Sequence, residues 1–544
     1  MTQNAAASSG SAPTWQNWSG NVEHLPPAGG EDYYFTPKNL DELRAVLAAA
    51  KHAGVPVRVS GQRHSQPPLV ADDNRAVPTP KLTCYLVDMS CYVDIGANGI
   101  ELGPGPQQIT LNPGVREDDV DAFLSKNNLM FKTVTAGGFF SLGGMTAVDV
   151  HGATIDEPIF AETAPAFTIL GADGQLTTID ASTPPAGGWS PLQFARVSFG
   201  ALGIVTRITL DVLPRPYANT LQGGTQRYLA KDKADFISMM QPLLAAHDRL
   251  EVFYSPYAAA PNLPFPAQKN FLVLWWDIVA NPDPPIPNTP PSPPTACTLA
   301  QEGEFGAPLL GGLAGYGAQY VRASQYYNNP YDPLHWPPVP TSGYTAISFD
   351  EIEKQAAAAN AAYSELWLAE ASQVMFMSYF IELPDLDEAG LGKVWDGLAA
   401  VAGRVIQDGG FHIAAPMEFR FVKGGNSAMS SAYSTNPGAS FVNLDLIGFI
   451  EPTPSAQYPA LLLQFFADVE RDWIAMGGFP HNGKMYGFYD PALPAGTYTP
   501  AFNANFLAEL RTMRGERQDA FNDYRQSKDP GGVFDNEYLR LLLG

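Results

Sequence analysis

VPVRVSGQRHSQPPL, residues 55–69, joins an apolar strand to a turn that presents His64. Three valines alternate with other residues over its first five positions, which is the period-2 pattern of a half-buried strand. Gly61 opens the turn that follows, and Pro67 and Pro68 prevent a helix from starting behind it. Because such a turn exposes several backbone N–H groups beside an imidazole, we predict an anion-binding cradle with a nucleophile at its edge.

A helix is predicted immediately before this strand. Leucine, valine and alanine recur at helical spacing over residues 39–53, with Asn39 placed to cap the helix and Gly54 to end it. Helix, glycine, strand and turn therefore form one supersecondary unit that ends at His64.

Two further glycine-rich segments follow within about 150 residues. TAGGFFSLGGMTAVDVHGAT, residues 135–154, holds five glycines, and FGALGIVTRITLDVLPRP, residues 199–216, places two glycines ahead of an alternating strand. Between them, residues 167–180 predict a β-hairpin that turns at Asp173-Gly174. Glycines permit a close approach of the backbone that suits an extended polyphosphate ligand. No segment has the GxGxxG pattern, so a Rossmann unit is not indicated.

Composition narrows the class of protein. The 544 residues carry a net charge of -23, which disfavours nucleic acid and anionic membranes as partners. No basic leader with an apolar run opens the sequence, and no 18-residue apolar stretch is present, so we expect a cytoplasmic protein by default and no integral membrane segment. The three cysteines lack a zinc-binding spacing, and no metal site is predicted.

The middle of the chain predicts a largely antiparallel sheet covered on one face by helices. Helical patterns at 350–368 and 391–407 alternate with strand-like runs at 374–382, 413–422 and 440–450. The whole chain is therefore expected to be α+β.

Two segments are expected to lie outside the packed elements. Residues 1–30 are small, polar and rich in proline and glycine, which predicts a mobile arm. NPDPPIPNTPPSPPT, residues 281–295, predicts an extended loop that serves as a linker or as a lid.

Three motifs in fixed order carry a family resemblance: the strand followed by SGQRHS, the glycine segment that ends in His151-Gly152, and FGALGIVT. Together they resemble the FAD-binding domain of the vanillyl-alcohol oxidase (p-cresol methylhydroxylase-type) flavoprotein family, convincingly over residues 31–215 and fairly well over the last 80 residues. The resemblance implies FAD as cofactor, bonded covalently to His64. A second attachment is not implied, because the glycine segment lacks the cysteine of doubly attached members.

The same resemblance implies a domain organisation and a set of cofactor contacts. The expected parts are a flexible arm (1–30), a two-subdomain FAD-binding domain (31–217), a substrate domain built on the antiparallel sheet (218–460) and a C-terminal segment that completes the FAD domain (461–544). The expected FAD contacts besides His64 are Ser60, Gly61, Gln62, Arg63, Ser65, Gly137, Gly138, Ser141, Gly144, His151, Gly152, Gly203, Ile204, Val205 and Asn536, the last in a C-terminal DPGGVFDN motif.

MEFRFV, residues 417–422, contains the first candidate for catalysis. Glu418 and Arg420 are two residues apart in a predicted strand and therefore lie on the same face. The spacing alone fits a buried ion pair equally well. An E-x-R pair lies before the flavin in type II cholesterol oxidases and in aldonolactone and alditol oxidases, which this region resembles, and there a carboxylate accepts a hydroxyl proton while a guanidinium stabilises negative charge.

Three more candidates come from resemblances to the same enzymes. PHNGK, residues 480–484, resembles the histidine-tryptophan-glycine-lysine motif of aldonolactone and alditol oxidases and implies a role for Lys484, although Asn482 replaces the tryptophan. RLEVFYSPY, residues 249–257, resembles a segment of type II cholesterol oxidase that contains a gating acid. The matching residue here is Glu251, which is expected to pair with Arg420. QNWS, residues 16–19, resembles the same enzyme. In VNLDLIG, residues 442–448, Asp445 stands where that enzyme has a pocket asparagine. A solvated lysine and a surface carboxylate remain the alternative interpretations.

The implied function is an FAD-dependent oxidase of a C–OH group that passes a hydride to flavin N5 and uses dioxygen to form hydrogen peroxide. The expected substrate is a sterol or other bulky lipophilic alcohol, which the resemblances around Glu251 and Glu418 and the aromatic middle region favour. PHNGK favours the alternative, a polyol or aldonolactone oxidised by an oxidase or a dehydrogenase. A flavin-binding or lipid-binding protein without turnover is the alternative from another class.

Overall fold

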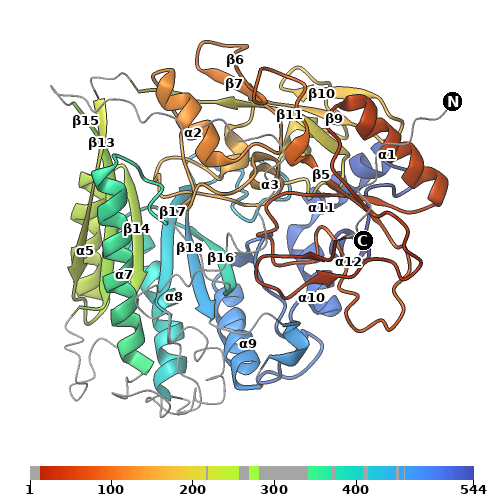
Figure 1. Ribbon diagram of the computed structural model, residues 1–544. Helices are drawn as coiled ribbons and strands as arrows, with labels where there is room; N and C mark the ends of the chain where they lie inside the picture. The colour runs from red at the N-terminus through yellow and green to blue at the C-terminus, as the bar shows by residue number, and fades with distance from the viewer. Residues whose placement is uncertain are drawn as a thin grey trace.

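The computed structural model describes residues 13–215, 219–256, 269–280, 341–368, 374–407, 415–448, 453–458 and 460–544. Small sheets from the first 215 residues face one large antiparallel sheet from the middle of the chain, and the C-terminal helices pack beside both (Figure 1). The predicted α+β class is confirmed. The proline-rich segment at 281–295 lies outside the described residues. None of the helices in the described ranges combines the length and apolar composition needed to cross a bilayer.

The stretch that presents His64 begins in a three-stranded parallel sheet. The sheet has the order β3 (Tyr34–Phe35), β5 (Tyr85–Asp88) and β4 (Val57–Ser60). Helix α1 (Leu40–Ala53) precedes β4; the Asn39 side chain accepts a hydrogen bond from Glu42 N–H, and Gly54 ends the helix with a left-handed φ of 70°. The predicted helix, its cap and its terminator are therefore confirmed.

A five-stranded antiparallel sheet contains the strand of the glycine-rich segment 199–216, while the segment 135–154 forms α3 beside it. Its order is β10 (Leu176–Asp180), β9 (Ala166–Leu170), β11 (Ile204–Asp211), β7 (Gln108–Leu111) and β6 (Ile100–Leu102). The predicted hairpin is β9–β10, with Gly174 at a φ of 78° in its turn. Around this sheet lie α2 (Glu117–Lys126), α3 (Leu142–Ala147), α4 (Pro191–Ala195) and the short pair β8 (Leu129–Met130) and β12 (Leu213–Pro214).

Residues 14–27 are packed, which contradicts the predicted mobile arm over this range. Strands β1 (Trp15–Gln16) and β2 (Glu23–His24) pair, and Trp15 and Trp18 are buried. The Trp15 indole N–H donates to Ser60 Oγ at 2.9 Å, and the Trp18 backbone N–H donates to the Arg63 carbonyl at 2.8 Å. Burial of two tryptophans supplies the apolar area that fixes an otherwise polar segment. Residues 1–12 lie outside the described range.

The antiparallel sheet predicted for the middle of the chain is present and has seven strands, the last of which comes from the C-terminal segment. Its order is β13 (Asn219–Tyr228), β15 (Phe271–Ala280), β14 (Arg249–Tyr254), β17 (Met417–Lys423), β18 (Ser440–Gly448), β16 (Met375–Leu383) and β19 (Gly478–Pro480).

The sequence predicted helices on one face of this sheet, but helices pack against both faces, because the apolar side of α7 packs on part of the second face. On the first face, Phe419 packs on Phe236 of α5 (Lys233–Ala246) and Tyr379 packs on Trp473 of α9 (Ala460–Ala475), with α8 (Glu388–Gln407) between these helices. On the second face, α7 (Thr341–Ala361) covers β13 and β15 through Phe349 and its neighbours. The rest of the second face, on β14, β17, β18 and β16, looks towards the small sheets.

The C-terminal helices α10 (Ala504–Arg514), α11 (Glu516–Lys528) and α12 (Glu537–Leu543) return to the first sheet (Figure 1). Val57 N–H donates to the Val533 carbonyl at 2.7 Å, and the buried Arg58 guanidinium donates to the Phe534 carbonyl at 2.6 Å. These bonds fix strand β4, and with it the turn that carries His64.

Candidate active site

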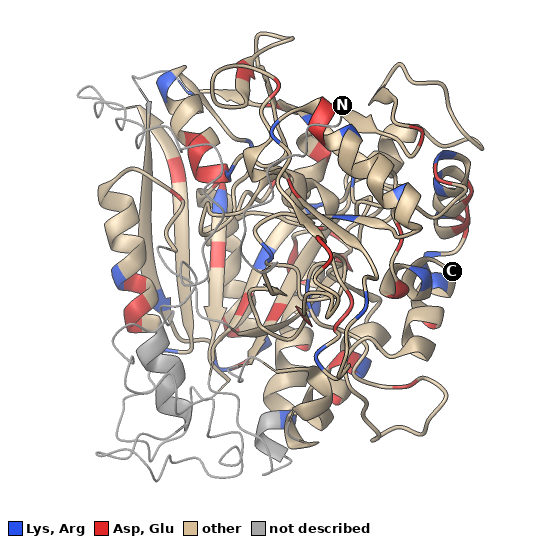
Figure 2. Ribbon diagram, turned by 45° about the vertical axis from the view of Figure 1, so that its right-hand side comes forward, with Lys and Arg blue, Asp and Glu red and all other residues tan. Residues whose placement is uncertain are grey.

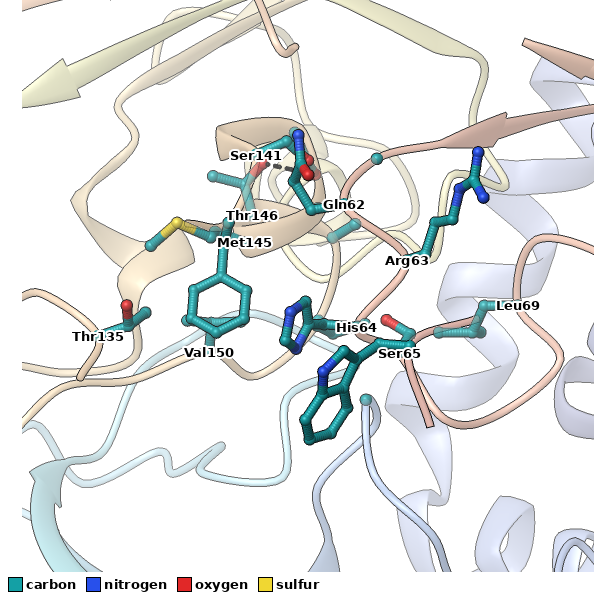
Figure 3. Close-up of a pocket in the computed structure, with 18 of the residues that line it drawn as sticks. Gln62, Arg63, His64, Ser65, Leu69, Thr135, Ser141, Met145, Thr146 and Val150 are labelled. Carbon is teal, nitrogen blue, oxygen red and sulfur yellow. Dashed lines mark hydrogen bonds between the residues drawn. The ribbon is translucent and has the colours of Figure 1, made fainter. Parts of the chain in front are cut away.

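A large cavity lies between the small sheets and the second face of the large sheet, with about 2150 Å³ of empty space including its part open to solvent. The turn at residues 60–65 and the glycine-rich segment line one end of the cavity, and β17 and β18 line the other. Figure 3 shows His64 pointing from its turn towards the segment that carries Thr135 and Val150. One cavity therefore joins the His64 turn to the strands that carry Glu418, Arg420 and Asp445.

Aromatic rings surround His64. Trp18 stacks on the imidazole with ring centroids 4.7 Å apart and an interplanar angle of 18°. Phe139 stacks at 5.3 Å, and Phe140 meets the ring edge-on at 4.5 Å. Burial and the nearby Lys484 hold the pKa of His64 well below its usual range, so the imidazole is neutral and a ring nitrogen keeps its lone pair.

The glycines of the cradle are required by close approach. A Cβ on Gly61 would lie 2.2 Å from Ser141 Oγ, so any other residue at position 61 would force the Ser141 hydroxyl at the start of α3 to move. Gly203, at a φ of 135°, would place a Cβ 2.6 Å from the Leu170 carbonyl oxygen. A long cavity walled by exposed backbone, small residues and aromatic rings fits an extended dinucleotide with a flat heterocycle, and FAD is such a group.

Most predicted cofactor contacts line this cavity with His64. They are Ser60, Gly61, Gln62, Arg63, Ser65, Gly137, Ser141, Gly144, His151, Gly203 and Val205. Their contacts with FAD stay predictions.

Four of the predicted contacts do not line the cavity. Gly138 follows the lining residue Gly137, and Gly152 is pressed against the Val134 carbonyl. Ile204 is fully buried in the core under α1. Asn536 caps α12 and donates to the Pro68 carbonyl at 2.7 Å. Their position in the motifs reflects packing beside the cavity.

Two rows of side chains cross the large sheet at the other end of the cavity. Opposite one another in β14, β17, β18 and β16 stand Phe253, Glu418, Asp445 and Ser378, and in the next row Glu251, Arg420, Asn443 and Phe380. Residues opposite each other in an antiparallel sheet share a face, with Cβ atoms about 5 Å apart. Figure 2 shows charged residues within strands as well as on helices.

Arg420 joins two carboxylates. Its Nη2 lies 2.8 Å from Glu251 Oε1 and also contacts Glu418 Oε1. The Trp367 indole N–H donates to the other Glu251 oxygen at 2.9 Å. Burial raises the pKa of Glu251 to about 8, although Arg420 opposes this shift. The predicted Glu251–Arg420 contact is present; Glu418 and Arg420 line the cavity, and Glu251 lies behind them.

Asp445 and Lys484 face the same end of the cavity as this ion pair. Burial lowers the pKa of Lys484, while Asp445 and Glu418 favour its charged form. Burial lowers the pKa of His151 to about 3 and that of His481 well below its usual range, so both imidazoles are neutral. The site can therefore offer carboxylates, cations and neutral rings to one ligand.

Asn482 holds the PHNGK turn in place and does not line the cavity. Its backbone and side-chain N–H groups donate to the buried Asp149 carboxylate at 2.9 Å and 2.6 Å. Arg514 donates to the Asn482 oxygen at 2.6 Å. This network holds His481 and Lys484 against the cavity wall.

The sequence interpretation missed Trp18, Phe139, Phe140 and Trp367 as lining residues. Trp18 belongs to the QNWS motif, which carried a resemblance but no role. The two phenylalanines stand among the glycines of residues 135–154. For Trp367 the sequence holds no signal, because its contact with Glu251 joins positions 116 residues apart.

Two family models match the chain. One, described as FAD binding domain, covers residues 32–180, and the other, described as D-arabinono-1,4-lactone oxidase, covers residues 392–542. The chain is 25% identical over 201 residues to L-gulonolactone oxidase of Mus musculus, which is 37% of this chain and 40% of that protein. It is 25% identical over 250 residues to L-gulono-1,4-lactone dehydrogenase of Mycobacterium tuberculosis, 45% of this chain and 50% of that protein. The matches thus span half or less of these relatives' lengths.

The fold is shared with a solved structure over almost the full chain. Cholesterol oxidase from B. sterolicum superposes with a TM-score of 0.70 at 14% identity, covering 98% of this chain and 96% of that one. At this identity the likeness shows the fold alone. One family model covers the His64 turn and the glycine segment, and the other covers the E-x-R strand and PHNGK. The chain is therefore similar to the vanillyl-alcohol oxidase (p-cresol methylhydroxylase-type) family of FAD flavoproteins, with features of the aldonolactone oxidases.

Proposed function

We propose that this protein is an FAD-dependent oxidase of a C–OH group, with the cofactor attached through His64. One observation carries the proposal: a single cavity runs from the His64 turn to Glu418 and Arg420. The residues at the first end fit FAD, and those at the second end fit a hydroxyl group that loses a proton.

Bound FAD would supply the two-electron acceptor, which takes a hydride from the carbinol carbon and returns the electrons to dioxygen as hydrogen peroxide. The Glu418 carboxylate accepts a hydrogen bond from the substrate hydroxyl and assists loss of its proton. Arg420 and Lys484 lie at the same end and stabilise the negative charge that develops on the oxygen. Burial of these groups keeps water from competing with the substrate.

For the substrate, the reacting end favours a polyol or an aldonolactone. The lining at this end carries the polar groups Glu418, Asp445 and Lys484, and Asp445 Oδ1 has no hydrogen-bond partner among the described residues. A substrate with several hydroxyl groups satisfies such polar groups, whereas a single-hydroxyl lipid leaves buried polar atoms unpaired at a cost of about 1–3 kcal/mol each. The similarity of residues 392–542 to D-arabinono-1,4-lactone oxidase supports the same class.

A sterol or other bulky lipophilic alcohol is the second candidate. The wall beside Glu418 carries Phe253, Phe376, Ile447, Trp367 and Leu368, an apolar surface suited to a large hydrocarbon. The fold shared with cholesterol oxidase makes this class worth testing.

Anaerobic titration of the yellow protein tests the proposal. We expect polyols or aldonolactones to bleach the flavin absorbance, and air to restore it with formation of peroxide. Bleaching by sterols alone would reverse the order of the two substrate classes. If air does not restore the absorbance but an added electron acceptor does, the protein is a dehydrogenase and not an oxidase. Flavin absorbance that no alcohol changes would favour a flavin-binding protein without turnover, and a protein that never carries flavin would refute the proposal.

A further inference from the structure

Glu418 and Asp445 form a carboxyl pair, and we propose that the pair holds one proton, with Asp445 as the member that receives the proton of the substrate hydroxyl. This proposal rests on the proposed function and specifies which residue receives the proton in that reaction. Asp445 thereby becomes a catalytic residue in its own right.

The geometry of the pair follows from the register of the sheet. Glu418 on β17 stands directly opposite Asp445 on β18, so both side chains project from the same face. Both residues line the cavity, and they are 8% and 7% exposed. Two carboxyl groups are thus held side by side where substrate would bind.

The two carboxyl groups differ in their partners. Glu418 Oε1 contacts Arg420, whose Nη2 also bonds Glu251. Asp445 Oδ1 has no hydrogen-bond partner within the described residues although it is buried. Among the ion pairs of the described residues Glu418 has Arg420 as a partner and Asp445 takes part in none, so Asp445 is the member of the pair whose carboxyl is not held by a bonded cation.

The groups around Asp445 come from three other elements. Glu418 and Arg420 face it from β17, the Ser378 hydroxyl faces it from β16, and Lys484 faces it from the turn after β19. Burial and then Glu418 raise the pKa of Asp445 to about 6, while Lys484, Ser378 and Arg420 oppose the shift. Two neighbouring carboxyl groups resist being ionised together, because each negative charge disfavours the other. A base is most effective when its pKa lies near the working pH.

The chemical step balances with this assignment. The carbinol C–H bond breaks and its electron pair leaves as hydride to the oxidised flavin of the proposed function. The O–H bond breaks, its proton forms an O–H bond on Asp445, and its electron pair becomes part of the product C=O bond. The new Asp445 carboxylic acid then donates a hydrogen bond to the Glu418 carboxylate, which shares the proton until solvent removes it.

The experiment compares Asp445→Asn with Asp277→Asn in the flavin-loaded protein. Asp277 lies on β15 of the same sheet and bonds His247, away from the cavity lining. We expect the wild-type protein to lose activity below about pH 6, and Asp445→Asn to lower kcat/KM by about 10²–10⁴-fold and to remove this acid limb. Asp277→Asn should keep both the rate and that acid limb. An Asp445→Asn protein with wild-type kcat/KM and an unchanged acid limb would overturn the proposal.

Infrared difference spectra between about pH 4 and about pH 8 give a readout that needs no turnover. Among the bands of the buried carboxyls, which include those of Glu117 and Glu251 at higher pH, we expect a protonated-carboxyl band with a midpoint near pH 6 that disappears in Asp445→Asn and moves to lower pH in Glu418→Gln, because the neighbouring negative charge is gone. A midpoint unaffected by Glu418→Gln would refute the shared proton, even if Asp445→Asn failed to fold. If no alcohol bleaches the wild-type flavin while the band behaves as expected, the oxidase proposal fails and the carboxyl pair stands.

Discussion

Trp18 lies face to face with His64, at 4.7 Å between ring centroids and 18° between ring planes. One ring comes from an N-terminal segment and the other from the turn after β4. The backbone bond from Trp18 N–H to the Arg63 carbonyl holds the two segments together. The side chain that we propose to attach the flavin is therefore fixed by a residue from outside its own motif.

Covalent attachment is the first expectation to test. When the yellow protein is denatured in acid, we expect the flavin to stay with the precipitated polypeptide, because a neutral His64 nitrogen can hold the bond. His64→Ala should precipitate colourless and leave its flavin in solution. A colourless wild-type pellet would show that the flavin is not covalently attached. A yellow His64→Ala pellet would show that the flavin is attached to another residue.

Trp18 should control how completely the flavin attaches. Trp18→Ala removes the stacked ring and hydrates His64, so we expect a smaller fraction of acid-stable flavin than in the wild-type protein. Trp18→Phe keeps an aromatic ring over the imidazole and serves as the matched control, with attachment close to wild type. Absorbance of the acid-precipitated protein measures the fraction. Equal attachment in Trp18→Ala and Trp18→Phe would show that the stacking has no role.

Arg420 should be far more important for stability than an exposed arginine. Arg420→Met leaves Glu251 and Glu418 buried without their shared cation, and we expect a loss of about 3–5 kcal/mol in the free energy of unfolding. Arg404→Met breaks a pair with Asp472 in which both side chains are about one-third exposed, and should cost about 1 kcal/mol or less. Chemical denaturation of both variants at one pH makes the comparison. Similar losses would mean that the buried pair is dispensable.

Glu117 should make stability fall as the pH rises. This carboxyl is fully buried beneath the glycine segment, where it accepts a hydrogen bond from Thr135 N–H at 2.8 Å, and burial raises its pKa to about 8. A pKa above the unfolded value means that the folded state binds the proton more tightly. The stabilisation is therefore complete below the unfolded pKa, near 4.5, and is lost as the pH rises to about 8.

Glu117→Gln measures that contribution, because an amide keeps the acceptor for Thr135 and cannot titrate. Between about pH 5 and pH 8 we expect the wild-type protein to lose about 1.4 kcal/mol per pH unit relative to the variant. Unfolding free energies at several pH values give the slope. A difference that does not change with pH would mean that Glu117 stays ionised throughout.

Local signals in the sequence were enough for the framework of the fold. Asn39 and Gly54 mark the two ends of α1, and both could be predicted because a cap and a left-handed terminator act within a few residues. The alternation over 417–422 indicated that Glu418 and Arg420 share a face. By contrast, the packing of Trp15 and Trp18 contradicted the mobile arm, because a polar composition does not reveal what two tryptophans contact.

The candidate site was predictable where one strand or turn carries it. Spacing could not show that Glu418 stands opposite Asp445, since that depends on the register of β17 and β18. Nor could it show that Asn482 bonds Asp149, 333 positions away, instead of facing the cavity. Family motifs also led to residues such as Asn536, which packs beside the cavity. A motif does not distinguish a residue that contacts the cofactor from one that supports the contacting residues.

The packed N-terminal segment changes where this domain can be cut. The family model begins at residue 32, and a shortened protein designed from that boundary would start after both tryptophans. It would retain every cradle glycine and His64, yet lack the ring that covers the imidazole and the indole that bonds Ser60. A protein cut at the family boundary would therefore lack the tryptophan that covers His64, the proposed site of flavin attachment. Expression and engineering should retain the chain from residue 13 onwards.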